Sequence, residues 1–326
     1  MFKLRRKILS IATIIVVGAV GLVGCSKGTE EVKEVETFKI SMVLDKGGVN
    51  DQSFNQSAWE GALEAQKEYE GVQVNYLEST TDADYLTNIE TAVDNESDLI
   101  IGVGFQLTDA IGKAAELYPE QKFAIIDGSY ENIAHNIKPI LFNEEQSGYT
   151  VGLIAGKVTK TNKLGFIGGM DIPSVSNFLV GFEKGAKEVN PNIEVYSQYA
   201  NSFTDAAKGK AIANIMANNG ADILFSAGGG VNNGVIEACS ELGLKEIGVD
   251  MPTNHVAPEV VLTSALKNVG TGVKLTIKDL IDGNFKGGEA SVYDLTNGGV
   301  GYEDTKLIPE DVKAYVTEKI KEASNK

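Results

Sequence analysis

The sequence predicts an α/β protein built from two doubly wound, Rossmann-like lobes. From Phe38 onward, short runs rich in β-branched and aromatic residues alternate with amphipathic stretches of helical period. Most of these runs are largely apolar, which is typical of parallel strands covered on both faces by helices. They form two successive blocks, with the change near Asn143. Because about 300 residues exceed what one hydrophobic core normally serves, we expect each block to form its own lobe.

The expected strands are short and rich in β-branched and aromatic residues, and the expected helices space their apolar residues three and four apart. The first block places strands at Phe38–Leu44, Val72–Leu77, Leu99–Gly102, Phe123–Ile126 and Pro139–Phe142. The second block places them at Lys163–Ile167, Ile193–Tyr199, Ile223–Ser226, Glu246–Val249 and Val260–Leu266. Helices are expected at Ser53–Glu70, Asp84–Asn95, Thr108–Tyr118, Gln146–Val158, Val175–Val189, Asp205–Asn218, Asn232–Leu242, Val269–Asp282 and Pro309–Ala323.

The N-terminal segment has the layout of a bacterial lipoprotein signal. A basic start precedes an apolar run from Ile8 to Gly21, and the run ends in the lipobox Leu22-Val23-Gly24-Cys25. The run is too short for a stable transmembrane helix; the alternative is a membrane helix in which the cysteine is incidental. We expect residues 1–24 to be removed as a signal peptide, Cys25 to be lipidated and residues 25–37 to form a polar tether. The body is then held at the extracytoplasmic face of the cell membrane.

The charge limits the partners that the chain can bind, and the cysteine and histidine content limits its disulfides and metal sites. Four of the 29 Lys and Arg residues precede Cys25, which leaves 25 against 45 Asp and Glu residues in the mature chain. Such an acidic surface repels nucleic acid and anionic lipids, so membrane residence would depend on acylation. Cys239 has no partner for a disulfide and is expected to be buried. His135 and His255 lack metal-ligand spacing, so we expect no metal site. No cofactor is expected either.

Ligand sites of doubly wound sheets lie at the carboxyl ends of the strands. Asp45, Asp127 and Asp250 each follow an expected strand directly. Ionised carboxylates only accept hydrogen bonds, which suits the vicinal hydroxyl groups of a sugar, although three of them could also bind a cation. Asp51 or Ser53 is expected to cap the helix that follows.

Two aromatic residues and one lysine are expected at the same edge. Phe54 and Phe203 lie in polar loops, where a planar heterocycle could stack between them; each could instead pack the start of its own helix. Lys267 could donate to a ligand, pair with a carboxylate or be a surface charge. The glycines around Gly228 form no nucleotide-binding motif; they indicate a tight bend or, as the alternative, backbone N–H groups that donate to a neutral ligand. No catalytic acid–base pair stands out, so no enzymatic activity is expected.

Residues 45–61, DKGGVNDQSFNQSAWEG, resemble the signature of the basic membrane protein family, which comprises purine nucleoside receptor lipoproteins of ABC importers. The resemblance continues through residues 123–127, 146–152, 168–170, 181–185 and 248–250, and it covers the mature chain. It implies a type I periplasmic-binding-protein fold with three hinge crossings, near Phe142–Glu144, Asp250–Thr253 and Tyr293–Asn297. Lobe 1 would then hold residues 38–142 and 251–293, and lobe 2 residues 143–250 and 294–326.

The resemblance also implies a function. The chain would bind a purine nucleoside (guanosine, inosine or adenosine) and deliver it to a permease and an ATPase on separate chains. Phe54 and Phe203 would sandwich the purine, Asp45 and Asn55 would lie at its polar edge, and Asp127, Gly228, Asp250 and Lys267 would hold the ribose. The alternatives are a receptor for a pentose or furanose signal, a surface adhesin lipoprotein or an enzyme on the same lobes; the paired aromatic residues favour the nucleoside.

Overall fold

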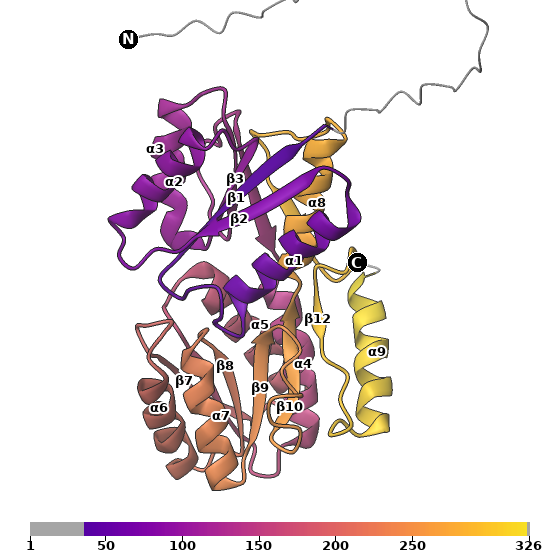
Figure 1. Cartoon of the computed structure of the whole chain (residues 1–326). Helices are drawn as coiled ribbons and strands as arrows, with labels where there is room; N and C mark the ends of the chain where they lie inside the picture. Colours follow the sequence, from indigo (N-terminus) through magenta and orange to yellow (C-terminus); the bar gives the residue numbers. More distant parts are fainter. Residues whose placement is uncertain (1–35, 325–326) are drawn as a thin grey trace, which may run out of the picture. The chain divides into compact units, whose positions relative to one another are not determined.

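The computed structural model describes residues 36–324, which contain two six-stranded sheets (Figure 1). Residues 1–35 and 325–326 lie outside the described residues. The predictions of a signal peptide and of lipidation at Cys25 therefore fall outside them, as does most of the expected tether.

The first sheet has the strand order β11-β5-β4-β3-β1-β2, and all its neighbouring strands are parallel. Its strands are β1 (Phe38–Leu44), β2 (Val72–Leu77), β3 (Leu99–Val103), β4 (Lys122–Ile126), β5 (Ile137–Phe142) and β11 (Ser291–Tyr293). Helices α1 (Phe54–Glu68) and α8 (Val269–Ile281) share one hydrophobic cluster with one face of the sheet. Helices α2 (Asp84–Asp94) and α3 (Thr108–Leu117), with the short 3-10 helix η1 (Phe105–Leu107), pack on the other face.

The second sheet has the order β12-β10-β9-β8-β6-β7 and is parallel except for β12, which pairs antiparallel with β10. Its strands are β6 (Lys163–Gly168), β7 (Glu194–Tyr199), β8 (Ile223–Ala227), β9 (Lys245–Asp250), β10 (Val261–Lys267) and β12 (Val300–Tyr302). Helices α4 (Glu144–Val158), α5 (Pro173–Val189) and α9 (Glu310–Ser324) pack on one face. Helices α6 (Ala206–Asn218) and α7 (Val231–Leu242) pack on the other.

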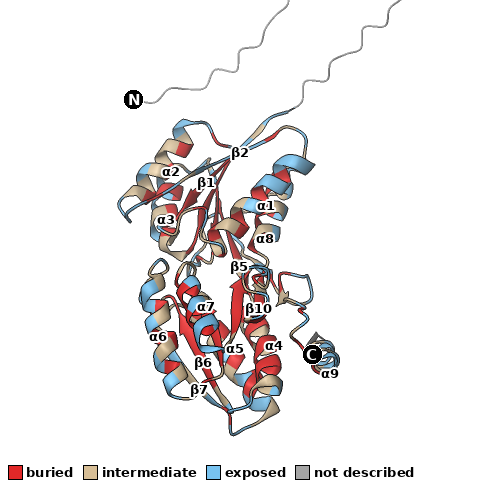
Figure 2. Ribbon diagram, turned by 60° about the horizontal axis from the view of Figure 1, so that its bottom comes forward, coloured by how far each residue is buried: buried red, intermediate tan, exposed pale blue. Residues whose placement is uncertain are grey.

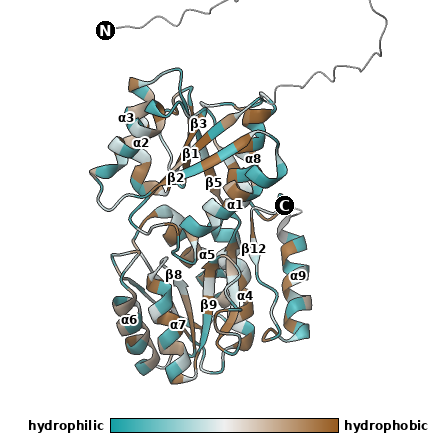
Figure 3. Ribbon diagram, in the orientation of Figure 1, coloured by the Kyte–Doolittle hydropathy of each residue, from teal (hydrophilic) through white to brown (hydrophobic). Residues whose placement is uncertain are grey.

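The central strands are buried on both faces, as their continuous apolar runs predict. Every residue of β3 and β8 is buried, and Figure 2 shows buried strands flanked by helices with exposed outer faces. Figure 3 shows the matching pattern of hydropathy, with hydrophobic strands and helices that are hydrophilic on one side. Cys239 is fully buried on α7, as predicted. The expected class, two doubly wound α/β lobes, is confirmed.

The chain crosses between the two sheets three times. It leaves the first sheet at Asn143, between β5 and α4, and makes its last crossing between β11 and β12; both positions were predicted. The prediction of the second crossing at Asp250–Thr253 is wrong. The loop after β9 returns the chain to the second sheet, where β10 pairs in parallel with β9, so the crossing follows Lys267 and residues 251–267 belong to lobe 2.

Helices α1 and α8 of lobe 1 pack with their backbones in contact. A Cβ atom built on Gly61 would lie 2.1 Å from the carbonyl oxygen of Gly270, so glycine is required for this approach. The amide of Gly270 also donates to Ser57 Oγ at 3.3 Å. This packing fixes the start of α1 beside the segment that enters lobe 1 after the second crossing.

Candidate ligand-binding site

One cavity lies where the carboxyl ends of strands from both sheets meet. It encloses about 600 Å³ of empty space, part of it open to solvent. Seven of the eight ligand-binding residues predicted from the sequence line it: Asp45, Phe54, Asp127, Phe203, Gly228, Asp250 and Lys267. The eighth, Asn55, does not. Several separate stretches of each lobe thus contribute to one site.

Asn55 positions a carboxylate instead of facing the cavity. Its side chain is buried, and Nδ2 donates to Asp45 Oδ1 at 2.7 Å and to the carbonyl oxygen of Gly48 at 3.1 Å. The amide of Gly47 donates to the same Asp45 oxygen at 2.9 Å. Burial raises the pKa of Asp45, and the hydrogen bonds from Asn55 and Gly47 oppose that rise. Oδ2 of Asp45 lies beside Gly104 at the cavity wall.

Asp51 caps helix α1, as the sequence predicted for Asp51 or Ser53. Its carboxylate accepts hydrogen bonds from the amides of Ser53, Asn55 and Gln56 at 2.9 to 3.0 Å. Burial nevertheless raises the pKa of Asp51 to about 6, with these amides opposing the rise. Because Asp51 satisfies the helix start, the side chain of Ser53 is free for another contact.

The two predicted aromatic residues come from different lobes and line the same cavity. Phe54 is the first residue of α1 and packs against the first sheet's core, while Phe203 follows β7 and packs against the second. Glycine makes room for Phe203, because a Cβ on Gly169 would lie 2.4 Å from its ring carbons. Phe105 of η1 also lines the cavity.

A buried lysine joins the carboxylates of the site. Lys267 Nζ lies 2.5 Å from Asp127 Oδ2 and 2.9 Å from Glu144 Oε1, and its side chain is only 2% exposed. The ammonium also lies 5.3 Å from the ring centroids of both Phe54 and Phe142, a cation–π distance. Sequence analysis missed Glu144, since it had no pattern to separate this residue from other acidic residues at helix starts.

Burial and charge act against each other in this cluster. Burial raises the pKa of Asp127 to about 7, although Lys267 opposes the rise, and burial likewise raises the pKa of Asp250. For the lysine, burial disfavours the charged form, but Asp127 and Glu144 outweigh it and raise the pKa of Lys267. Asp127 Oδ1 is buried and accepts no hydrogen bond from the described residues. The cluster therefore has unused capacity to accept a hydrogen bond.

Asp127 and Asp250 occupy equivalent positions in the two lobes. Each ends or follows a strand, and each has the left-handed backbone conformation, with φ of 61° and 65°. This conformation is uncommon for residues other than glycine and is best tolerated by Asn and Asp. The sharp turn that follows each strand thus brings a carboxylate to the cavity.

Gly228 contributes a close backbone approach and not the free N–H group that the sequence suggested. Its amide already donates to Asn232 Oδ1 at 2.8 Å. A Cβ on Gly228 would lie 3.1 Å from the side chain of Val231 and 3.2 Å from the amide of Gly169. The glycine therefore allows the loop after β8 to pack closely against Gly169 and Val231.

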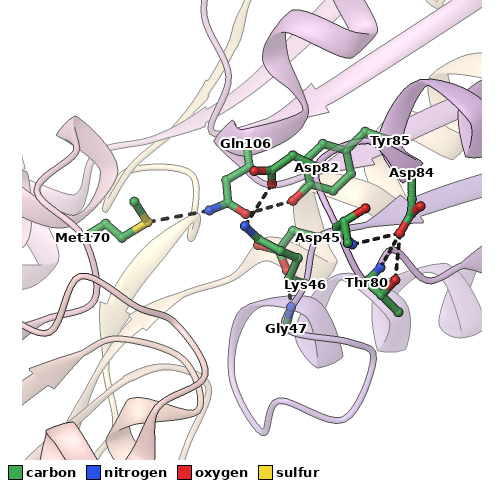
Figure 4. Close-up of polar contacts among 10 residues, drawn as sticks. Asp45, Lys46, Gly47, Thr80, Asp82, Asp84, Tyr85, Gln106 and Met170 are labelled. Carbon is green, nitrogen blue, oxygen red and sulfur yellow. Dashed lines mark hydrogen bonds and ion pairs between the residues drawn. The ribbon is translucent and has the colours of Figure 1, made fainter.

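Besides the ion pair of Lys267 with Asp127, other polar contacts connect the two lobes. Ser53 Oγ donates to Asp250 Oδ2 at 2.5 Å. At a second point, shown in Figure 4, Gln106 Nε2 lies 3.6 Å from Met170 Sδ, while Gln106 Oε1 accepts from the hydroxyl of Tyr85 at 2.9 Å. These contacts form only when the two lobes are close together, so they favour a closed arrangement.

The cavity offers many hydrogen-bond acceptors and one cation. Asp45, Asp51, Asp127 and Asp250 line it together with Lys267. This set can bind hydroxyl and N–H donors and repels phosphate. Within residues 36–324, no group of three or more His, Cys, Asp or Glu side chains is arranged to hold a metal ion. Over the same range, no helix has the length and apolar character needed to cross a bilayer.

Comparison with known proteins adds independent information. Residues 38–326 match the Bmp family, described as "ABC transporter substrate-binding protein PnrA-like". The chain is 39% identical to a "CD4+ T-cell-stimulating antigen" of Listeria innocua over 94% of this chain and 92% of that protein. It is 36% identical to an "ABC transporter nucleoside-binding protein BmpA" of Lactococcus lactis over 91% of each chain. Among solved structures, an ABC transporter solute-binding protein from Aeropyrum pernix is similar, with a TM-score of 0.75 at 30% identity; the match covers 87% of this chain and 86% of that one.

Proposed function

The chain belongs to the Bmp family of PnrA-like ABC transporter substrate-binding proteins, and from this premise we propose that it binds a purine nucleoside between its lobes. The observation that carries the proposal is one cavity lined by an aromatic ring from each lobe, Phe54 and Phe203, and by a buried cluster of carboxylates around a lysine. A nucleoside has both matching parts, a flat heterocycle and a polyhydroxyl sugar.

The purine lies between the two rings in this proposal. Stacking on aromatic side chains contributes about 1–3 kcal/mol per base and tolerates different purines. Asp45 is the acceptor for N–H groups at the edge of the base, because Asn55 and the Gly47 amide hold its Oδ1 and leave Oδ2 at the cavity wall. Asn55 acts through Asp45 and does not itself contact the base.

The ribose lies against Asp127, Asp250 and Lys267. Vicinal hydroxyl groups donate to carboxylates, and the ammonium donates to sugar or ring oxygens. Asp127 Oδ1, which lacks a donor among the described residues, gains one from a ribose hydroxyl. Gly228 lines the same cavity and lies beside the ribose in this proposal.

Ligand binding favours lobe closure because the nucleoside contacts both lobes only in the closed state. The hydrogen bond from Ser53 to Asp250 adds to the same state, since it also spans the lobes. The closed receptor then presents the nucleoside to a membrane permease, which works with an ATPase on a separate chain.

We also propose that the receptor is a lipoprotein. Removal of residues 1–24 would expose Cys25 for acylation, and residues 25–37 would connect the lipid to the folded body at the extracytoplasmic face of the membrane. This anchor would hold the receptor near its permease.

Isothermal titration of the full-length chain in detergent tests the proposal. Guanosine, inosine and adenosine are expected to release or absorb heat with saturable 1:1 binding, whereas ribose and arabinose are expected to give none in the same concentration range. Binding of a pentose without binding of any nucleoside would overturn the assignment.

A pair of variants then tests whether the base stacks on Phe54. Phe54→Ala is expected to raise the Kd for adenosine about 10- to 100-fold, because one stacking partner is lost. Phe285→Ala is the matched control: this phenylalanine also packs against the first core from a partly buried position, but it does not line the cavity. Equal effects of the two substitutions would contradict the sandwich.

A further inference from the structure

A second cavity adjoins the sugar end of the proposed nucleoside site. It encloses about 1100 Å³ of empty space, part of it continuous with solvent. Phe105, Asp127, Ile172 and Ser174 line both cavities, so the two share a wall. Glu144, the carboxylate that pairs with Lys267, faces the second cavity. We call this space the sugar-side annex.

The chemistry of the annex differs from that of the base-binding end. Its other lining residues are Gln106, Thr108, Asp109, Ser129, Leu141, Phe142, Pro173 and Asn177. Three carboxylates lie in this wall, and no lysine or arginine does. The apolar side chains provide surface for an uncharged group, and the carboxylates favour a cation. The cation behind this wall, Lys267, is already paired with Asp127 and Glu144, and Asp109 adds a further negative charge, so entry of an anionic group is unfavourable.

The position of the annex indicates which carbon of the ribose lies next to it. If the vicinal 2′ and 3′ hydroxyls of the ribose donate to Asp127 and Asp250, the 5′ carbon is the sugar position left without a carboxylate partner. A substituent on that carbon can then extend past Asp127 into the annex. A 5′ substituent therefore need not displace the base from the aromatic pair.

We propose that the annex is a second subsite, which accepts an uncharged or cationic group on the 5′ carbon of a purine nucleoside and rejects an anionic one. The inference rests on the proposed nucleoside function. It widens the class of ligand to nucleosides with a thioether or an amine at the 5′ position.

Calorimetric titration of the full-length chain in detergent with four adenosine derivatives tests the annex. We expect 5′-deoxy-5′-methylthioadenosine and 5′-amino-5′-deoxyadenosine to bind within about threefold of adenosine or more tightly. Adenosine 5′-monophosphate, of similar bulk but anionic, is expected to bind at least about 100-fold more weakly. 3′-O-methyladenosine is expected to lose at least about tenfold, because it lacks a donor to the carboxylates. Failure of adenosine itself would overturn the proposed function; binding of adenosine with rejection of both uncharged and cationic 5′ derivatives would overturn the annex alone.

Two substitutions in the annex wall provide a second, independent measurement. Ser129→Trp fills the annex, so it should weaken the methylthio derivative at least about tenfold while adenosine stays within about threefold. Asp109→Arg supplies a counter-charge and should tighten the monophosphate at least about tenfold. Asp94→Arg, an exposed residue of α2 outside both cavities, makes the same charge change and should leave all affinities unaltered. Equal effects of the two arginine variants would show that only net charge matters and would contradict the subsite.

Discussion

Replacing Lys267 by methionine isolates the energetic role of the buried cation. The side chain is 2% exposed, and it neutralises Asp127 and Glu144, which are 8% and 4% exposed. Methionine keeps most of the side-chain volume, so the change removes charge with little loss of packing. It leaves buried carboxylates without a counter-charge, which in comparable cases costs about 3–5 kcal/mol of stability.

The cost should depend on pH in a defined direction. Burial raises the pKa of Asp127 to about 7 in the presence of the lysine, and loss of the lysine raises it further. An acid with a raised pKa in the folded state contributes stability that is complete below its unfolded pKa and is lost as pH rises through the folded value. In the variant the contribution of Asp127 continues to fall above pH 7, whereas in the wild type it has already ended there. The destabilisation should therefore be about 3–5 kcal/mol at pH 8 and at least about 1.4 kcal/mol smaller at pH 5.

Urea unfolding at pH 5 and pH 8, followed by the fluorescence of the single tryptophan, Trp59, measures this difference. Lys274→Met is the matched control, since Lys274 pairs with Glu64 and Glu68 on the exposed surface of α1 and α8. Its effect on the free energy of unfolding should be far smaller. Equal destabilisation by the two variants, or a Lys267 effect that is the same at both pH values, would refute the reasoning.

Three other predictions follow from particular contacts. Gly61→Ala pushes α1 away from α8 at Gly270 and should lower the free energy of unfolding by about 1–3 kcal/mol. Gly301→Ala is the control, because no atom lies within 4 Å of the new Cβ, and it should change this free energy by less than about 0.5 kcal/mol. Similar values for the two variants in urea unfolding would be inconsistent with contact between the two helix backbones. Burial raises the pKa of Glu246 to about 8, so the stability that its proton contributes is complete below the unfolded pKa and is lost as pH rises through 8. Glu246→Gln should therefore remove a decline in the free energy of unfolding of up to about 1.4 kcal/mol per pH unit. Parallel plots of this free energy against pH for the wild type and the variant would argue against the prediction. Ser53→Ala removes one hydrogen bond between the lobes and should raise the Kd for adenosine about tenfold; an unchanged Kd would mean that this contact does not favour closure.

The sequence predicted most of the fold because the apolar runs of parallel strands are strong local signals. The predicted strands appear within a few residues of their expected limits. β11 and β12 were missed, since each has three residues and gains its place only by pairing at a sheet edge. The second crossing was misplaced for a related reason: whether β10 joins one sheet or the other depends on its pairing with β9, which no local pattern specifies.

The site residues likewise include some that local sequence patterns predict and some that depend on tertiary packing. Asp45, Asp127 and Asp250 could be located because strand ends in this topology converge on one edge, and those residues directly follow or end strands. The partner of Lys267 at Glu144 could not be located, because it depends on how α4 packs beside the first crossing. Asn55 follows Phe54 directly, yet the helix directs its side chain to Asp45 and not to the cavity.

Lys267 ends β10, and α8 of the other lobe begins at Val269, so the cation of the cavity stands at a pivot of the molecule. One short stretch of chain therefore both contributes a charge to the cavity and connects the two lobes. A homologue that changes this lysine to bind a different solute therefore also changes the crossing between its two lobes. Divergence of ligand preference should proceed more readily through Phe203 or the loops after β7 and β8, which lie away from any crossing.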